Sequence, residues 1–407
     1  MSQTPFNRAS STSSSNKIAP TTHTAAQEAG DGVVVLFPGG HGTPQLRPFP
    51  YTSRWGTSPP GTPAGEQLHY ARRRHPSAGP RRRREAQIMA RDFEHQPVML
   101  AEVVETFADV RAPVGMGPGL IIDATTGGAG HAAAILEANP TIELLGLDQD
   151  PTAVAVARER LARFGHRAEV RRASFDALPD ILDVDPRPLV GVLFDLGVSS
   201  HQLDVPERGF SHRSPGPLDM RMDPDAELTA ATVVNDYDEY ELRSLLRRYA
   251  DERHAARIAS AIVAHRPLLD TAHLAHVVKE AVPAAVRRKG RHPAMRTFQA
   301  VRIEVNRELD VIEPTLQGVV DRLEPGGRVA VLSYHSGEDR IVKHVLRVAA
   351  DGACDCPSGL PCICGAGPTV RLLRRKVSRP TEAEVLENPR AASARFRAAE
   401  RLNFSEN

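Results

Sequence analysis

The chain has few cysteines, few aromatic residues and no long apolar run. Of its 407 residues, four are Cys, one is Trp, and Phe, Trp and Tyr together make up 5%. The four cysteines lie together near the C-terminal end, which excludes a scaffold of disulfides spread along the chain. No apolar run approaches the roughly 20 residues of a membrane-spanning helix. The N-terminus also lacks the charged-then-apolar layout of a secretion signal. We therefore expect a cytoplasmic protein with no membrane partner.

The clustered cysteines leave three interpretations open. They are Cys354, Cys356, Cys362 and Cys364. Four neighbouring thiols can bind zinc in a reducing compartment. Their spacing is Cys-x-Cys instead of the usual Cys-x2-Cys, however, and the segment is rich in Gly and Pro. A redox clasp and a loop whose thiols have no function are the alternatives, and the last is favoured.

Charge is nearly balanced overall but unevenly distributed. The formal net charge is +1, yet residues 1–88 carry 11 Lys and Arg against 4 Asp and Glu, which leaves 40 basic and 46 acidic residues for the remainder. The first 88 residues have too little apolar sequence to form a core. We predict that they are a disordered basic extension, and that Met89 is either the true start or the domain edge. An RNA-binding surface on the acidic remainder would have to be a local basic patch.

The most informative stretch is a glycine-rich loop between two short apolar runs. The first run ends at Asp123, three glycines lie within 127–130, and the second run ends at Asp148. Glycines let a backbone approach a ligand, and an acidic residue on the next strand accepts hydrogen bonds from ribose hydroxyls. The loop does not match Gly-x-Gly-x-x-Gly, and a charged Asp123 would repel a pyrophosphate and attract an ammonium or sulfonium group. The pattern favours S-adenosylmethionine over a nicotinamide dinucleotide, with a plain turn as the alternative.

From about residue 89, short apolar runs alternate with stretches that can form helices. This alternation is typical of a parallel, doubly wound sheet in an α/β fold. The predicted strands lie near 119–123, 143–147, 168–172, 190–195 and 327–333. About 130 residues separate the last two strands, far more than one crossover helix needs.

The long gap predicts a helical insertion at about 206–298. Helical periodicity is present in three stretches, 240–249, 257–263 and 274–278. A crossover helix over about 299–323 then returns the chain to the sheet, and the following Pro325 ends it. We predict four parts: an extension (1–88), the first half of the sheet domain (89–205), the helical insertion (206–298) and the second half of the sheet domain (299–407).

A second site signal follows the fourth predicted strand. Asp195 ends an apolar run, and a loop of small residues follows it. In doubly wound sheets, ligands react at this edge. A structural carboxylate that caps the next turn is the alternative for Asp195. Phe175, after the third strand, could lie against an adenine ring or simply pack in the core.

Eight motifs occur in order along the chain: Asp123–His131, Asp195–Ser200, Gln202–Asp204, Arg208–Ser211, Gly216–Asp223, Phe298–Asn306, Ser333–Lys343 and Glu387–Arg390. Together they closely resemble the RsmH/MraW family. These are S-adenosylmethionine-dependent methyltransferases that act on N4 of a cytidine in the decoding region of small-subunit (16S) ribosomal RNA. The resemblance runs from about Glu94 to the C-terminus. It implies a Rossmann-like class I methyltransferase sheet with an insertion for substrate recognition.

The resemblance also implies a cofactor site for S-adenosylmethionine. Asp148 matches the acceptor for ribose hydroxyls, and Phe175 matches the neighbour of the adenine. The chain departs from the family pattern at Gly128 and Ala129, where Arg-Gly is common, and at Gly337, where Leu is usual. The family positions that contact the cofactor correspond to seven residues of this chain: Ala129, Gly130, His131, Asp148, Phe175, Asp195 and Gln202.

Methylation of a cytosine amine needs an acceptor for the amine hydrogens, because the nitrogen lone pair is delocalised into the ring. Asp195 is the candidate catalytic residue, although its loop lacks the aromatic residue that many amino-methyltransferases place there. No metal is required. For His131 we favour a backbone contact with the cofactor over acid–base work. His335 and Ser336 either line the RNA pocket or cap a turn.

The RNA partner would be held by the insertion and by basic stretches at 286–292 and 371–379. The mixed charges of Asp219, Arg221 and Asp223 indicate either a functional loop or an internal salt bridge. A homodimer is left open. Two other classes of protein also stay open, a nicotinamide oxidoreductase and a non-catalytic RNA-binding assembly factor with a methyltransferase-like fold.

Overall fold

The computed structural model describes residues 97–288, 292–352, 356–357, 363–364 and 366–403, which all belong to one compact unit, 74–407. The predicted extension, Met89, Cys354 and Cys362 lie outside the described residues, so the expectations for them stay predictions. Among the described helices, none is both long and apolar enough to cross a membrane.

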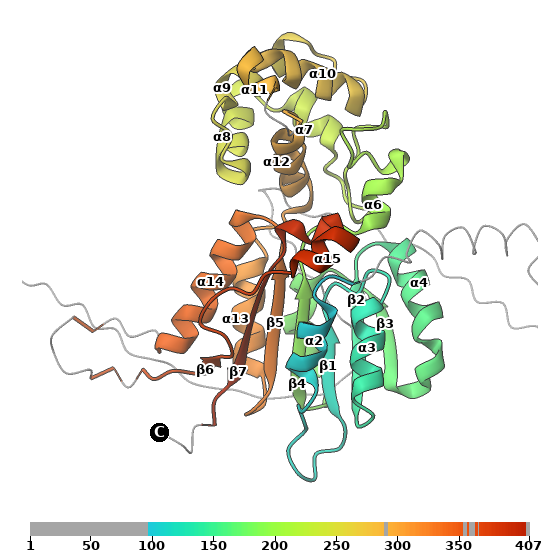
Figure 1. Cartoon of the computed structure of the whole chain (residues 1–407), viewed down its shortest axis with the longest axis vertical. Helices are drawn as coiled ribbons and strands as arrows, with labels where there is room; N and C mark the ends of the chain where they lie inside the picture. The colour runs from blue at the N-terminus through green and yellow to red at the C-terminus, as the bar shows by residue number, and fades with distance from the viewer. Residues whose placement is uncertain (1–96, 289–291, 353–355, 358–362, 365, 404–407) are drawn as a thin grey trace, which may run out of the picture. The chain divides into compact units, whose positions relative to one another are not determined.

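A seven-stranded sheet forms the centre of the described unit (Figure 1). Its order is β3-β2-β1-β4-β5-β7-β6; β1 to β5 are parallel, and β7 runs antiparallel to both β5 and β6. The strands are β1 Gly119–Asp123, β2 Ile142–Asp148, β3 Ala168–Arg172, β4 Leu189–Asp195, β5 Arg328–Ser333, β6 Val370–Leu372 and β7 Arg395–Arg401. The five predicted strands are confirmed, and β6 and β7 were missed.

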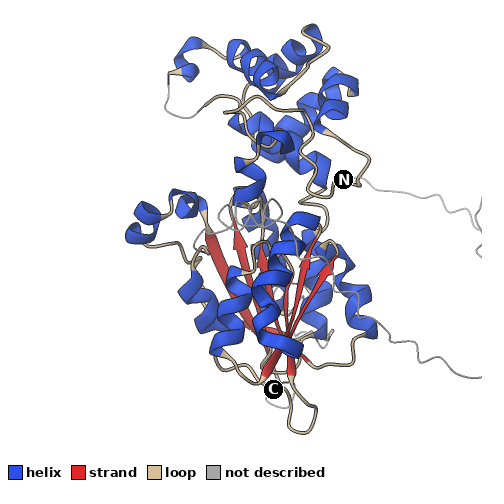
Figure 2. Ribbon diagram, turned by 90° about the vertical axis from the view of Figure 1, so that its right-hand side faces the viewer, coloured by secondary structure: helices blue, strands red, loops and turns tan. Residues whose placement is uncertain are grey.

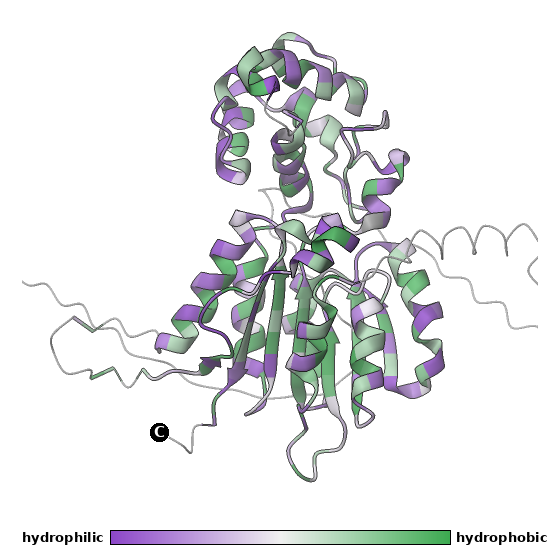
Figure 3. Ribbon diagram, viewed as in Figure 1, coloured by the Kyte–Doolittle hydropathy of each residue, from purple (hydrophilic) through white to green (hydrophobic). Residues whose placement is uncertain are grey.

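Helices cover both faces of the sheet, as Figure 2 shows. Alternate residues of β1 point to opposite faces, so Ile121 packs in one core with α2, α3 and α4, while Leu120 and Ile122 pack in the other with α5, α13 and α14. The central strands are apolar along their length, because both of their faces are buried (Figure 3). The doubly wound α/β fold is therefore confirmed. These helices are α2 Leu100–Phe107, α3 Gly130–Ala138, α4 Pro151–Leu161, α5 Leu178–Val184, α13 Ile312–Arg322 and α14 Ser336–Asp351.

The region between β4 and β5 is mostly helical and has a core of its own, which runs from Phe210 to Val305. The three stretches with helical periodicity fall in α8, α9 and α10, as predicted. The helices are α6 Ser200–Asp204, α7 Ala230–Asp236, α8 Glu239–Ala250, α9 Ala255–Ala264, α10 Thr271–Ala281, α11 Ala284–Arg287 and α12 Met295–Asn306. The same region contains η3 Pro206–Arg208, and shorter elements elsewhere are η1 Ala162–Arg167, η2 Phe175–Ala177, α15 Glu382–Glu387 and η4 Pro389–Ser393.

The prediction of a single crossover helix over 299–323 is wrong. Two helices, α12 and α13, occupy this stretch, and Arg307 separates them with a left-handed backbone (φ 51°). The Arg307 N–H returns to the last turn of α12 and closes it, as a glycine usually does. The boundary drawn after residue 298 falls inside α12, whose apolar side belongs to the core of the helical region. The other domain limits stay predictions.

Gly→Ala changes at two positions, one in β4 and one in α13, should have opposite effects on the free energy of unfolding. A Cβ at Gly191 would lie 2.9 Å from the buried Phe107 ring and 3.1 Å from Ile121, so overpacking should lower the free energy of unfolding by about 1–3 kcal/mol. At Gly318 in α13 the nearest atom is 3.4 Å away, at the end of the Arg322 side chain. Alanine there should stabilise by roughly 0.5–1 kcal/mol. Urea denaturation measures both, and equal losses would contradict this packing.

Candidate active site at the carboxyl ends of the strands

Three acidic residues end three neighbouring strands. Asp148 is the last residue of β2, Asp123 of β1 and Asp195 of β4, and these strands are adjacent in the order β2-β1-β4. Because parallel strands end at the same edge, the three carboxyl groups lie along one side of the sheet. This is the arrangement that the sequence spacing predicted.

The loop between β1 and α3 is shaped by its backbone and held by Asp148. Gly127 and Ala129 both adopt left-handed conformations, with φ of 50° and 58°. The two carboxylate oxygens of Asp148 accept hydrogen bonds from the N–H groups of Gly127 (2.8 Å) and Asp150 (2.9 Å). A Cβ at Gly130 would lie 2.4 Å from the ring of Pro97. The loop is therefore fixed by a carboxylate on one side and by the segment before α2 on the other.

Burial changes the charge of the acidic residues at this edge. Burial raises the pKa of Asp148 to about 6, although the hydrogen bonds from the two backbone N–H groups lower it. Burial raises the pKa of Asp123 to about 8, with a smaller contribution from the negative charges of Asp195 and Asp148. Asp123 is therefore largely protonated at neutral pH in this structure. The sequence argument that gave Asp123 a negative charge is wrong here.

The carboxylate of Asp195 is held by an aromatic side chain from the next strand. The hydroxyl of Tyr334, directly after β5, donates to Asp195 Oδ1 at 2.7 Å. Burial raises the pKa of Asp195, whereas a positive charge on His131, when its ring is protonated, and the Tyr334 hydrogen bond lower it. Burial also raises the pKa of Tyr334 well above its usual value, so its hydroxyl stays a donor. Tyr334 was not predicted as a site residue.

The remaining predicted cofactor residues lie around this edge. His131 is in the first turn of α3, buried, with Nε2 2.9 Å from the carbonyl oxygen of Val98. Phe175 follows β3 and makes an edge-to-face contact with Phe194, with ring centroids 5.7 Å apart. Its packing in the core is thus observed, and a contact with adenine stays a prediction.

Gln202 lies in α6 and connects two elements. Its Oε1 accepts the N–H of Ser199 at 3.0 Å, which completes a capping box, and its Nε2 donates to Asp150 Oδ2 at 3.2 Å. Asp150 caps α4 through the N–H of Thr152. The side chain of Gln202 therefore contacts Asp150, which lies two residues after Asp148.

Sequence reasoning missed an ion pair between the sheet and the helical region. Arg208 Nη1 lies 2.5 Å from Asp150 Oδ2, and Arg208 Nη2 donates to the carbonyls of Arg221 (2.8 Å) and Met222 (3.1 Å). Burial alone would raise the pKa of Asp150, but the hydrogen bond and charge of Arg208 lower it. No local sequence pattern indicates this ion pair, because 58 positions separate Arg208 from Asp150.

The structure confirms one interpretation from each of two pairs that the sequence left open, and the functional ones, contact with RNA and a functional loop, stay predictions. His335 is the N-cap of α14: its Nδ1 accepts the N–H of Gly337 at 3.2 Å, and Glu338 accepts the N–H of His335 at 3.1 Å. Capping is thus confirmed for His335. Arg221 pairs with Asp219, with Nη2 and Oδ2 2.7 Å apart, so the internal salt bridge is confirmed.

Among the described residues, Glu308, His335 and Glu338 have the spacing of a metal site. Arg302 already pairs with Glu308 through two hydrogen bonds of 2.8 and 2.7 Å. Because His335 Nδ1 accepts a backbone N–H, its ring proton is on Nε2, 3.1 Å from Glu338. Glu308 therefore already has a charged partner, Arg302, without an ion.

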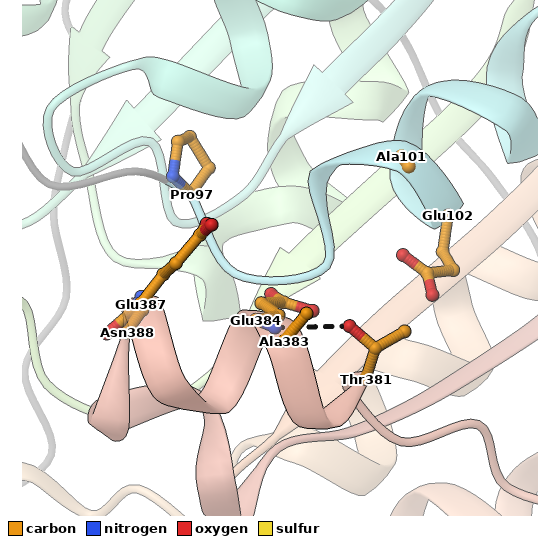
Figure 4. A pocket seen from close by; sticks show the side chains of 8 residues that line it. All are labelled: Pro97, Ala101, Glu102, Thr381, Ala383, Glu384, Glu387 and Asn388. Atoms are coloured by element: carbon orange, nitrogen blue, oxygen red, sulfur yellow. Dashed lines mark hydrogen bonds between the residues drawn. The ribbon is translucent and has the colours of Figure 1, made fainter.

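A pocket of about 300 Å³ lies between the start of α2 and α15 (Figure 4). Three of its lining residues are acidic: Glu102, Glu384 and Glu387. The Oε1 atom of Glu384 accepts the N–H of Met99 at 2.6 Å. No predicted cofactor residue lines this pocket, so it is separate from the acidic strand edge.

Several cations of the predicted RNA-binding stretches already have acidic partners. Arg287 pairs with Glu280 at 2.6 Å and Arg371 with Glu400 at 2.7 Å. Residues 289–291 lie outside the described residues. Four other basic residues of the two stretches are exposed and pair with no described acidic residue: Arg288, Arg375, Lys376 and Arg379.

Comparison with known proteins identifies relatives over most of the chain. Residues 92–402 match the MraW methylase family. The ribosomal RNA small subunit methyltransferase H of Salinispora tropica is 52% identical over 76% of this chain and 84% of its own, and that of Symbiobacterium thermophilum is 47% identical over 77% and 98%. The solved structure of an rRNA methylase from Streptococcus thermophilus aligns with 75% of this chain and 97% of its own at 12% identity and a TM-score of 0.33, so it supplies no residue correspondence.

The raised pKa of Asp123 predicts a pH-dependent stability. The folded protein keeps a proton that the unfolded chain releases, so this stabilisation is complete at low pH and is lost as pH rises from the ordinary value of 3.8 to about 8. Asp123→Asn should therefore gain stability over the wild type between about pH 5 and pH 8, by at least ~1 kcal/mol. Urea denaturation at several pH values measures this difference. An Asp180→Asn control, exposed on α5, should follow the wild type.

Proposed function

The chain belongs to the MraW methylase family, and from this premise we propose that it methylates N4 of a cytidine in the decoding region of small-subunit (16S) ribosomal RNA. The methyl donor is S-adenosylmethionine. The observation that carries the proposal is the position of Asp195, which is fixed by Tyr334 at the same sheet edge as the glycine-rich loop and Asp148. A donor site and an acceptor for amine hydrogens are thereby adjacent.

The cofactor site is assigned to the residues that the motifs indicated. The loop Ala129–His131 would hold the cofactor through its backbone, since the conformation of Ala129 begins α3 with N–H groups that face the loop. Asp148 would accept the ribose hydroxyls. Phe175 would lie beside the adenine, and Gln202 would contact the cofactor from α6.

The residues present fit this cofactor. A Cβ at Gly127 would meet only one atom within 4 Å, so the loop is open at that position. Asp148 already ties the loop to β2, so a ligand that binds its remaining lone pairs finds the carboxylate in place. When bound, S-adenosylmethionine supplies an electrophilic methyl group on a sulfonium.

Asp195 prepares the cytosine amine for reaction. By accepting a hydrogen bond from the amine, it localises the nitrogen lone pair and then removes a proton as the new bond forms. Its own position is fixed at both ends, because Tyr334 holds its side chain and its backbone N–H donates to Thr125 Oγ1 at 2.6 Å. A fixed acceptor of this kind reduces the entropy that must be lost to align the reactants.

RNA binding is assigned to the helical region within 206–298 and to exposed basic residues of the stretch 371–379. These sites offer local positive charge on a mostly acidic unit. The ion pair of Arg208 with Asp150 connects the helical region to the cofactor edge. The partner is the small ribosomal subunit, so we place the protein in the cytoplasm.

We expect the full chain to form N4-methylcytidine in small-subunit RNA when incubated with labelled S-adenosylmethionine and subunits. Mass spectrometry of nucleosides and mapping of the modified position measure this product. Asp195→Ala should lose turnover by roughly 10²-fold or more while keeping its melting temperature. Asp321→Ala, exposed on α13, is the matched control. An active Asp195→Ala variant would mean that Asp195 is structural.

We expect Asp148→Ala to weaken S-adenosylmethionine binding by about 1.5–3 kcal/mol, because charge-assisted hydrogen bonds to the ribose are lost. Isothermal titration calorimetry measures the affinity, and circular dichroism checks that the variant is folded. An unchanged affinity in a folded variant contradicts the ribose assignment. Binding of NADH by the wild type would instead favour an oxidoreductase.

A further inference from the structure

His131 lies buried between a carbonyl oxygen and a carboxylate. Its Nε2 is 2.9 Å from the carbonyl oxygen of Val98, and its Nδ1 is 3.5 Å from Asp195 Oδ2. A carbonyl can only accept a hydrogen bond, so Nε2 carries a hydrogen. The ring position at which a proton can arrive or leave is therefore Nδ1, and it faces Asp195.

No hydrogen bond joins Nδ1 of His131 to Asp195. Charge-assisted hydrogen bonds between nitrogen and a carboxylate oxygen measure about 2.7–2.9 Å, whereas Nδ1 and Oδ2 are 3.5 Å apart. In the neutral ring, with its hydrogen on Nε2, Nδ1 carries a lone pair. A proton placed between them would convert this contact into an ion pair.

The surroundings fix the geometry of this pair. Tyr334 holds Asp195 Oδ1 at 2.7 Å and leaves Oδ2 directed at His131. The tyrosine ring lies over Gly197, where a Cβ would come within 3.3 Å of it and where φ is +97°. On the opposite side of the ring of His131, the Val98 carbonyl belongs to a short segment that Glu384 anchors through the N–H of Met99.

The other titratable groups near the pair are acidic. Glu338, in the first turn of α14, and Asp123, at the end of β1, both interact electrostatically with Asp195. Glu338 accepts the N–H of Tyr334 at 2.7 Å. Among the described residues, no Lys or Arg contributes to the pKa shift of Asp195. The negative charge of Glu338 therefore favours an extra proton on the pair.

We propose that Asp195 passes the proton of the target amine to Nδ1 of His131. His131 then holds this proton and acts on the reaction through Asp195, as a positioning residue. This step rests on the methyl transfer proposed above. The amine lone pair forms the N–C bond, the C–S bond breaks and its electron pair stays on sulfur as a thioether. The amine proton moves to Asp195 and then to Nδ1. The positive charge of the sulfonium is thereby transferred to the imidazolium, which releases the proton to water before the next turnover.

The pH dependence of single-turnover methyl transfer tests this proposal in the full chain with small subunits. In the wild type, the rate should fall at acid pH, where Nδ1 already carries a proton and cannot accept another. His131→Gln keeps an N–H that can donate to the Val98 carbonyl but has no site that binds a proton. Its plateau rate should fall by roughly 10- to 100-fold, and its acid limb should move to lower pH, because one of the two sites that can bind the inhibiting proton is gone. The affinity for S-adenosylhomocysteine should change by less than about threefold.

Two further variants separate proton storage from a structural role. Tyr334→Phe removes a hydrogen bond that favours the ionised form of Asp195, so its acid limb should move to higher pH, opposite to His131→Gln. His166→Gln, exposed in η1, should keep the wild-type profile. An unshifted acid limb in His131→Gln would show that His131 only supports the loop.

Nitrogen NMR of the histidine rings tests the geometry without any substrate. In the neutral ring of His131 the proton should be on Nε2, and Asp195→Asn should change the response of Nδ1 to pH. A neutral ring with its proton on Nδ1 overturns the proposal. This measurement stays decisive if His131→Gln does not fold. If the wild type forms no N4-methylcytidine, the proposed function fails, whereas the NMR result still reports on the pair.

Discussion

The burial of three carboxyl groups at one sheet edge is the constraint that organises this molecule. Each charge is accommodated in a different way. Asp123 keeps a proton, Asp148 is surrounded by backbone N–H groups, and Asp195 is placed between a tyrosine hydroxyl and a histidine. These arrangements also determine the conformation of the glycine-rich loop, the start of α4 and the position of the Tyr334 side chain. A site that uses one acid as ligand and another as proton acceptor needs this difference between chemically identical side chains.

The sequence predicted the parallel half of the sheet well, because β1, β2 and β4 are buried on both faces and read as apolar runs. It missed β7, where Arg395 and Arg397 alternate with Phe396 and Ala398 and form ion pairs with Asp339. It merged α12 with α13, since the helix ends at Arg307 and neither glycine nor proline marks the end. A non-glycine residue with positive φ depends on tertiary packing, which local pattern does not record.

The site shows the same division between local and long-range information. Spacing along the chain was enough to find Asp148 and Asp195, because each follows its own strand. The partners of these residues were not predictable in this way: Tyr334 is 139 positions from Asp195, and Arg208 is 58 from Asp150. The charge of Asp123 was also misjudged, since its protonation depends on how many acids share the edge. Contacts between strands, not motifs, determine the chemistry of these groups.

The hydrogen bond between Met99 and Glu384 joins residues 285 positions apart, and β7 is inserted between β5 and β6. The segment that holds the ring of His131 is therefore anchored by a residue that is synthesised long after it. A nascent chain lacks this anchor and strands β6 and β7 until these residues have been made. Assembly of the complete site must therefore await synthesis past β7, although its glycine-rich loop is made much earlier.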